Sequence, residues 1–349
     1  MPPKVERAKD GEPAPVEVET PSGDFYLFAY TALSGGKTRL FAVATTAAGP
    51  VKLDSEGSHP SLPKVSGDGK SIAYTASVEG KNEILLFDGQ DSVNLTNGFA
   101  KDNWLGGVAS DGSKVVSSTL ADSNLDIFLF DKNGDKLQLS TGATDETEPR
   151  ISRDGTGVTF TRITLEKPGQ TKSDVYFVMA DGSGLKKLTD NSAHNYSPDI
   201  SPDGSRICYI STELGSQQLF IVNADGSGLR RAPGGSHMNC SDPTFSPDGK
   251  KILFNATGYD QESPQEFDIF ELELDKIGSL AGLKNLTQDI DYHCQSPYYS
   301  TDGKRIFFLQ TDTLATMTQD DKGMPVTGQV QRQLLMSMPI TGGKAVKVH

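Results

Sequence analysis

A short motif, Ser-x-Asp-Gly followed by an apolar run, recurs along the chain and constrains its fold more than any other feature. Six copies begin at Ser66, Ser110, Ser152, Ser201, Ser246 and Ser300. The copy at Ser110 lacks the residue between Ser and Asp, and a degenerate copy, Ser22-Gly23-Asp24, precedes the six. Successive serines are 42 to 54 residues apart, close to the length of a four-stranded propeller blade. This period predicts similar units packed side by side.

Each repeat unit carries the signals of four short strands. The Asp-Gly turn is followed by an apolar run, as at 251–254 (Lys-Ile-Leu-Phe), and then by a second one, as at 174–178 (Asp-Val-Tyr-Phe-Val). A further Gly turn, as at 180–184, leads into a more polar run, as at 185–189. Apart from a short turn near 276–286, no sustained 3.6-residue periodicity interrupts this pattern. The chain is therefore predicted to be all-β, with four-stranded antiparallel blades repeated around an axis.

The repeats predict a single β-propeller over residues 15–349, preceded by a polar tail at 1–14. We expect seven blades, with six as the alternative, starting near residues 15, 59, 103, 145, 194, 239 and 293. Blade one has its own candidate first strand at 15–19 (Pro-Val-Glu-Val-Glu), and blade seven has its own fourth strand at 345–348. Closure of the ring is therefore expected to depend on packing between blades rather than on an exchanged strand.

Two sequence patterns make the repeat resemble a known family. They are Ser-Pro-Asp-Gly-x-x-Ile-x-Tyr/Phe, at 201 and 246, and Val-x-Ala-Asp-Gly-Ser-Gly-Leu-x-x-Leu-Thr, at 178–189. Both resemble the TolB-type propeller repeat, a relative of the WD repeat that lacks its Trp-Asp signature. The resemblance covers about 15–349 and is strongest in 194–260. It implies that the starts of the innermost strands and the loops between second and third strands share one face of the ring.

The net charge and the lack of long apolar runs argue against some classes of partner and against membrane insertion. The formal net charge is −13 and the pI is about 4.9, whereas nucleic acid and anionic membrane surfaces attract basic proteins. No apolar run is long enough to span a membrane, and the first residues lack the apolar stretch of a signal peptide. We therefore expect a soluble, cytoplasmic protein without membrane insertion, or a periplasmic or secreted one if a signal has been removed.

Alignment on the motif serines gives candidate ligand-binding residues at the channel mouth. Seven residues before each serine stand His59, Asn103, Asp145, His194, Asn239 and His293. Close to them in sequence stand Trp104, Tyr196, Asp242 and Gln295. Side chains that enter a channel are wet and polar in any case. The pattern therefore fits a water-filled mouth as well as a ligand site.

A metal site and a cysteine pair are two further hypotheses. His194, His293 and Gln295 form the better metal-ligand subset, because imidazole with amide or carboxylate oxygen suits Zn or Mn, while carboxylates alone suit Ca. Cys240 and Cys294 occupy the same register on adjacent blades, so they fit a disulfide, a shared soft-metal site or two unlinked buried thiols. Cys208, inside an apolar run, is expected in the core.

The loops between second and third strands are unequal in length. Three are long, at 162–173, 256–266 and 310–332, and the family resemblance places them on the face of the channel mouth. Long structureless loops in a compact domain are usually functional or disordered. The motif Asp residues, in contrast, are explained by turn chemistry, because Asp caps its own turn and Gly supplies positive φ.

A structural assembly module is the third-ranked function; two functions rank above it, and the first is favoured. One is a non-enzymatic scaffold that binds a protein, a peptide or a small ligand at the channel mouth through exposed aromatics such as Trp104, Tyr196, Tyr259 and Tyr292. The other is a metal-dependent carbohydrate-active enzyme, because 293–297 (His-Cys-Gln-Ser-Pro) resembles part of the site of oligogalacturonate lyases. That family's close pair of ligand histidines is missing here, and no catalytic residue is assigned. The sequence contains no Gly-x-Ser-x-Gly elbow, so this motif gives no support for a fused hydrolase domain.

Overall fold

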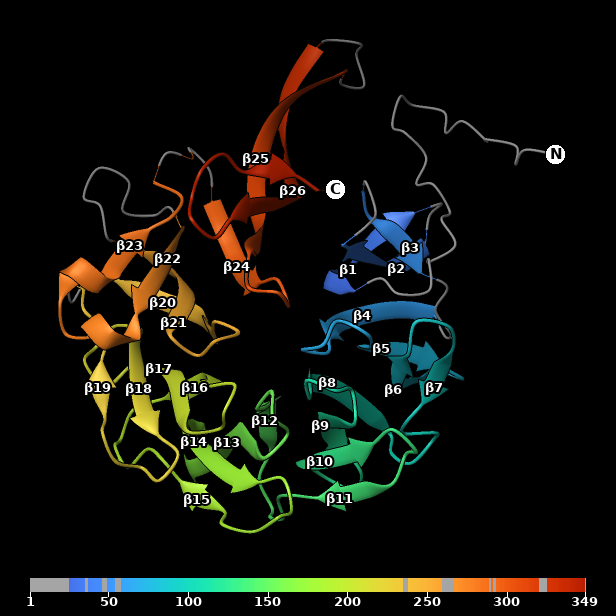
Figure 1. Ribbon diagram of the computed structural model, residues 1–349, viewed down its shortest axis with the longest axis vertical. Helices are drawn as coiled ribbons and strands as arrows, with labels where there is room; N and C mark the ends of the chain where they lie inside the picture. The colour runs from blue at the N-terminus through green and yellow to red at the C-terminus, as the bar shows by residue number, and fades with distance from the viewer. Residues whose placement is uncertain are drawn as a thin grey trace.

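The computed structural model describes residues 25–34, 37–45, 49–53, 58–234, 238–258, 267–288, 290, 293–319 and 325–348. Its sheets are arranged as blades around a central axis, with consecutive blades adjacent in the ring (Figure 1). The prediction of an all-β propeller with seven blades is confirmed, and the alternative of six blades is wrong. The predicted tail 1–14, the predicted strand 15–19, Tyr259 and Tyr292 lie outside the described residues.

Blades one to four contain the strands of the first half of the chain. Their bounds are β1 (Tyr26–Ser34), β2 (Lys37–Ala44) and β3 (Val51–Leu53); β4 (Ser58–Val65), β5 (Ile72–Val78), β6 (Lys81–Phe87) and β7 (Ser92–Asn94); β8 (Asp102–Val108), β9 (Lys114–Leu120), β10 (Leu125–Asp131) and β11 (Lys136–Gln138); β12 (Glu146–Ile151), β13 (Gly157–Lys167), β14 (Gln170–Met179) and β15 (Lys186–Lys187). Each sheet is antiparallel, with its strands in sequence order.

Blades five to seven follow the same order. Their bounds are β16 (Asn195–Ile200), β17 (Arg206–Ser211), β18 (Gln218–Asn223) and β19 (Arg230–Arg231); β20 (Asn239–Phe245), β21 (Lys251–Thr257), β22 (Asp268–Glu273), the 3₁₀ turns η1 (Leu274–Lys276) and η2 (Leu280–Gly282), and β23 (Leu283–Asn285); β24 (His293–Tyr299), β25 (Arg305–Gln319), β26 (Pro325–Pro339) and β27 (Val346–Lys347). Among the described residues, no helix is long and apolar enough to cross a membrane.

The motif turn is held together by its own side chains. In blade five, Ser201 Oγ donates to Asp203 Oδ1 at 2.6 Å, and Ser205 N donates to the same oxygen at 3.1 Å. Gly204 has a φ of 69°, in the left-handed region that a side chain disfavours. The structural interpretation of the repeated Asp is therefore confirmed by its contacts: the motif closes the turn from the first to the second strand.

Two of the three long loops are strands. Residues 162–173 continue β13 and β14 in paired register around Gly169, and 310–332 lie mostly in the 15-residue strands β25 and β26. This second hairpin extends outward from the ring (Figure 1). The prediction of structureless loops is wrong here, because runs rich in Thr and Val favour continued strand pairing. Most of the third loop, 256–266, lies outside the described residues.

Apolar clusters fill the spaces between neighbouring blades. Clusters occupy the junctions from one–two to six–seven, as in the five–six junction, where Phe254 and Phe270 stack at 5.7 Å between ring centroids. Among the described residues, no such cluster fills the junction between blades seven and one. The core is thus divided into separate apolar clusters, one between each pair of neighbouring blades. The seven–one junction differs, because its described residues form no such cluster.

Candidate binding site in the central channel

The register of blade three differs from the one read from the sequence. Ala109 N donates to Lys114 O at 2.9 Å, as Ser66 N donates to Ser71 O at 2.8 Å. Gly112 N also donates to Ala109 O, as Gly69 N donates to Ser66 O. Ala109 therefore occupies the first position of the motif, and no residue is missing from this copy. Counting from Ser110 was wrong by one, so Asp102 takes the place predicted for Asn103.

The residues seven positions before the motif join each blade to the preceding one. Their side chains accept hydrogen bonds from backbone N–H groups at or beside the start of the preceding third strand. The pairs are Asp102 with Asn82, Asp145 with Leu125, Asn239 with Gln217 and His293 with Phe267, at 2.9 to 3.3 Å. His194 Nδ1 lies 3.4 Å from Ser173 Oγ on the preceding blade, and His59 is exposed at the start of β4. Most of the side chains at this position therefore join neighbouring blades by hydrogen bonds.

The next register position is buried between the blades. Asn103, Glu146 and Asn195 have exposed fractions of 0%, and Cys240 and Cys294 are also buried. All three cysteines are free, so the hypothesis of unlinked buried thiols is confirmed. Burial raises the pKa of both Cys240 and Cys294 to about 12, which keeps their thiols protonated at neutral pH. Trp104 and Tyr196 are half-buried, and Tyr196 packs against the cluster of the five–six junction.

A different register lines the central channel. The residues two positions before the motif form a ring that we call the channel ring: Lys64, Gly107, Arg150, Asp199, Thr244 and Tyr298. All six line one cavity of about 210 Å³, to which Ser197 and Asp242 also contribute. Of the residues predicted for the site, Asp242 reaches this cavity. The sequence alignment on the motif also contains the positions of the channel ring. We predicted the positions seven residues before the motif because their side chains are polar, but polarity alone does not show which positions face the channel.

Two cations of the channel ring lie against neutral groups. Lys64 Nζ lies 4.5 Å from the centre of the Tyr298 ring and 3.5 Å from its hydroxyl. The charge of Lys64, aided by that of Arg150, lowers the pKa of Tyr298. Arg150 Nη1 donates to the carbonyl oxygens of Gly106 and Pro149, at 3.3 and 3.0 Å. Within the described residues, neither cation forms a salt bridge.

The carboxylates around the channel are already engaged. Asp199 Oδ2 accepts the Phe245 N–H at 2.7 Å, and burial raises the pKa of Asp199, an effect that the charge of Arg150 opposes. Asp242 Oδ2 accepts from Asn255 Nδ2 at 2.9 Å, and burial raises its pKa as well. The site therefore combines two cations that lie on neutral partners with two carboxylates whose ionisation is weakened.

A repeated backbone irregularity lies beside the channel ring. The residues four positions before the motif have left-handed φ values between 49° and 54° in five blades: Leu62, Glu148, Ser197, Asp242 and Ser296. Each is followed by a proline, and each lies where the pairing of the first and second strands shifts register. Such bulges bend a strand and re-aim its side chains. Here they precede the channel residues by two positions.

The predicted metal set is not assembled. His293 and Gln295 share a cavity of about 580 Å³ with Phe267, Thr311 and Gln333, but His194 does not line it. Across the described part of the chain, no group of three His, Cys, Asp or Glu side chains is placed to hold a metal ion. One imidazole, whose Nδ1 accepts a backbone N–H, and amide side chains do not match the donor set of a transition-metal site.

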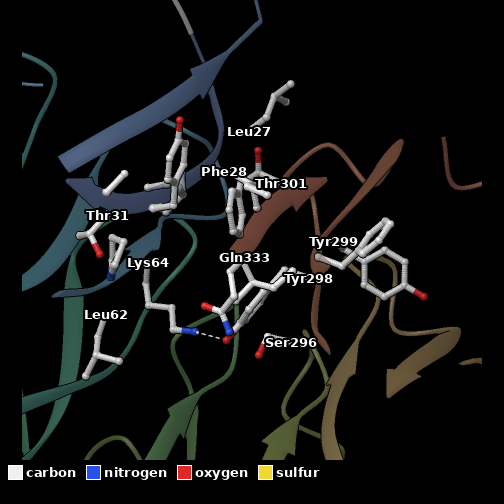
Figure 2. A pocket seen from close by; sticks show the side chains of 18 of the residues that line it. Leu27, Phe28, Thr31, Leu62, Lys64, Ser296, Tyr298, Tyr299, Thr301 and Gln333 are labelled. Atoms are coloured by element: carbon white, nitrogen blue, oxygen red, sulfur yellow. Dashed lines mark hydrogen bonds between the residues drawn. The ribbon is translucent and has the colours of Figure 1, made fainter. Parts of the chain in front are cut away.

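A second, larger cavity lies at the seven–one junction and meets the channel. It has a volume of about 750 Å³, and β1, β4, β24, β25 and β26 contribute its walls. Figure 2 shows Lys64 and Tyr298 in contact in its wall, joined by a hydrogen bond, with Phe28 and Leu27 on the β1 side. We call this cavity the junction cleft. It is more apolar than the channel and shares Lys64 and Tyr298 with it.

Bladed sheets around a polar channel define the chain as a seven-bladed β-propeller. Within that class it belongs to the TolB beta propeller domain family (PD40), whose sequence model matches residues 162–338. The chain is 36% identical over 111 residues to dipeptidyl-peptidase 5 of Porphyromonas endodontalis, covering 31% of this chain and 15% of that protein. It is 31% identical over 158 residues to a TolB homolog of Chlorobium luteolum, covering 34% and 36%. The matches thus span well under two thirds of these relatives.

Solved structures support the fold over the full ring. The β-propeller domain of the Trilobed protease from Pyrococcus furiosus, described as having an open velcro topology, aligns with a TM-score of 0.62 and 13% identity, over 95% of this chain and 97% of that one. An oligogalacturonate lyase in complex with manganese aligns with a TM-score of 0.60 and 13% identity, over 93% and 85%. At such identities the likeness concerns the fold alone.

Proposed function

We propose that the chain is a non-enzymatic TolB-like propeller that binds a protein or peptide partner at the channel face, with a carboxylate of the partner held between Lys64 and Arg150. One observation carries the proposal. Two cations line the same cavity, and neither forms a salt bridge with a carboxylate of the described residues. A desolvated cation gains strongly from a charge-assisted hydrogen bond, and guanidinium matches a carboxylate in two-point geometry.

The size of the channel favours a protruding group of a larger ligand. A cavity of about 210 Å³ admits an acidic side chain or a chain end, but not a folded domain. Asp242, on the same wall, can accept an N–H of the incoming backbone. The half-buried Trp104 and Tyr196 are candidates for contacts around the entrance, since aromatic residues are enriched at binding hot spots. These features support a partner anchored by one carboxylate.

The test uses an array of peptides that each carry either a free or an amidated C-terminus, with Glu and Gln forms of each sequence. Calorimetry measures binding to the wild type, K64M, R150M and the control R231Q, whose arginine is exposed on the outer strand β19. We expect acid forms to bind at least about tenfold more tightly than neutral forms, and K64M and R150M to remove that preference. Equal binding of acid and neutral forms, or an unchanged preference in both channel variants, would refute the proposal.

Carbohydrate lyase activity is the second candidate. The cavity shared by His293, Gln295 and Gln333 favours it, and uronic acid sugars also carry the carboxylate that Lys64 and Arg150 would bind. The assay follows unsaturated product from oligogalacturonate with added Mn, Zn or Ca, together with the metal content of wild type and H293A. Product formation lost in H293A would replace the scaffold proposal by an enzymatic one. The cytoplasmic location also stays a prediction.

A further inference from the structure

Beyond the channel ring, toward the motif turns, lies a further cavity that we call the floor cavity. It has a volume of about 160 Å³. Four of its wall residues also line the cavity of the channel ring: Ile151, Asp199, Thr244 and Tyr298. Residues of the motif turns line its far end, among them Arg153, Pro202 and Pro247. The two cavities therefore adjoin along the channel, and the floor cavity is the part nearer the motif turns.

Arg153 lies across this end of the channel. It is the second residue of the motif in blade four, a place that the other described copies fill with Gly67, Ser110, Pro202, Pro247 and Thr301. Arg153, which also borders the junction cleft, reaches blade seven, where its Nη1 and Nη2 lie 3.4 and 3.3 Å from Thr301 O. Both bonds are long, and both end on one neutral carbonyl oxygen. Since it forms no salt bridge with any described residue, Arg153 is a third channel cation on a neutral partner.

We propose that Arg153 forms a second anion-binding subsite in the floor cavity, so that the channel selects partners that present two carboxylates close together. This inference rests on the proposed function, in which Lys64 and Arg150 hold one carboxylate. Arg150 and Arg153 are three residues apart, so their Cα atoms are at most about 10 Å apart. The simplest matching group is a C-terminal Glu or Asp, whose side chain and chain end each carry a carboxylate.

The charges along the channel favour such a partner. The chain carries a formal net charge of −13, so a second negative charge on a partner is unfavourable unless local cations hold it. Three cations, Lys64, Arg150 and Arg153, line the two adjoining cavities. Asp199 is the carboxylate that both cavities share, and burial raises its pKa. A neighbouring anion raises it further, so Asp199 can take up a proton and donate it to the partner.

Calorimetry with four matched peptides tests the subsite. Acetylated Ala-Ala-Ala-Glu and Ala-Ala-Ala-Gln, each with a free or an amidated C-terminus, present two, one or no carboxylates. We expect the wild type to bind the diacid at least about tenfold more tightly than either monoacid. R153Q should lose this step but keep the preference for monoacids over the neutral peptide.

The matched control is R206Q. Arg206 also donates to a carbonyl of another blade, Gly249 O at 2.8 Å, but it lines neither cavity. R206Q should therefore bind all four peptides as the wild type does. Circular dichroism checks the fold of both variants, and the comparison of the four peptides on the wild type does not depend on how well R153Q folds.

The outcomes separate this inference from the function on which it rests. If the wild type prefers monoacids to the neutral peptide but gains nothing from the second carboxylate, the subsite is refuted and the first carboxylate site stands. If acid and neutral forms bind equally, both proposals fail. A diacid step that survives in R153Q would overturn the subsite. So would an equal loss in R206Q, because the effect would then come from weakened contacts between blades.

Discussion

The five–six junction and the seven–one junction show two ways in which neighbouring blades meet. At the first, a continuous cluster including Phe254 and Phe270 fills the wedge between sheets. At the second, Phe28 packs on Phe307 and Tyr298, and Thr301 donates two hydrogen bonds to backbone oxygens of blade one, beside a cavity of about 750 Å³. Both junctions come from the same repeat. The difference shows that the motif turn determines the structure of each blade, whereas the contribution of each junction to the stability of the ring depends on the side chains packed between the blades.

Truncation of an aromatic side chain at each junction gives the largest expected contrast. Phe254→Ala removes a ring with an exposed fraction of 0% and should lower the free energy of unfolding by about 3–5 kcal/mol. Phe28→Ala, at the half-buried wall of the junction cleft, should lower it by about 1–2 kcal/mol. Urea unfolding followed by circular dichroism measures both variants.

The same measurement can break the comparison. If Phe28→Ala is as damaging as Phe254→Ala, the seven–one junction is as tightly packed as the others. A conservative variant, Phe254→Leu, serves as the control, because it keeps most of the apolar volume and should recover more than half of the loss.

A hydrogen bond between blades four and five extends the comparison from apolar to polar contacts between blades. Across the four–five junction, Glu148 Oε2 accepts the Ser197 N–H at 2.8 Å, and within blade four the same oxygen accepts the Thr161 hydroxyl at 2.9 Å. Glu148→Ala leaves the Ser197 N–H without this acceptor and should cost about 2 kcal/mol in unfolding free energy. Glu148→Gln retains one oxygen acceptor and should cost about half as much. A loss below about 0.5 kcal/mol for Glu148→Ala would show that this bond does not hold the blades together.

The sequence predicted the blades well and the site poorly, for a physical reason. Turn chemistry is local, so Ser-x-Asp-Gly and the apolar runs after it identify the strands directly. Which face of a first strand looks into the channel depends on the bulge at residues such as Ser197. The proline that follows each bulge residue is visible in the sequence, but it does not show which side chains the bulge turns toward the channel. Polar residues were therefore assigned to the channel when they join blades, as Asp145 does, while Lys64 and Arg150 were overlooked.

The pH dependence of Glu146 gives a smaller effect in the same part of the ring. Its carboxylate is fully buried, bonded to Arg162 Nε and Ser140 Oγ, each at 2.8 Å, and burial raises its pKa from 4.5 to about 6. The folded state thus holds this proton more tightly than the unfolded chain does. Stability from this group is full below pH 4.5 and is lost as the pH rises through 6. Relative to Glu146→Gln, the wild type should gain about 1 kcal/mol between pH 7 and 4.5, once solvent screening is allowed for.

Urea unfolding at several pH values checks this sign. The difference between wild type and Glu146→Gln should change between pH 7 and 4.5 and stay constant above pH 7. A difference that grows with rising pH in favour of the wild type would mean that the ion pair with Arg162 outweighs burial. The pKa of Glu146 would then lie below its ordinary value.

The smallest expected effect tests the register of blade three. In blade five the Ser201 hydroxyl donates to Asp203 and accepts Arg206 N at 2.9 Å, and Ala109 occupies the equivalent place without a hydroxyl. Ala109→Ser should restore the missing pair of bonds around Asp111 and raise the unfolding free energy by about 0.5 kcal/mol, while Ser201→Ala should lower it by about 1 kcal/mol. The first substitution adds a hydroxyl, and the second removes one, at the same position of the repeat. Opposite signs would therefore establish that this position is equivalent in both blades, whereas a loss in both would return the register to Ser110.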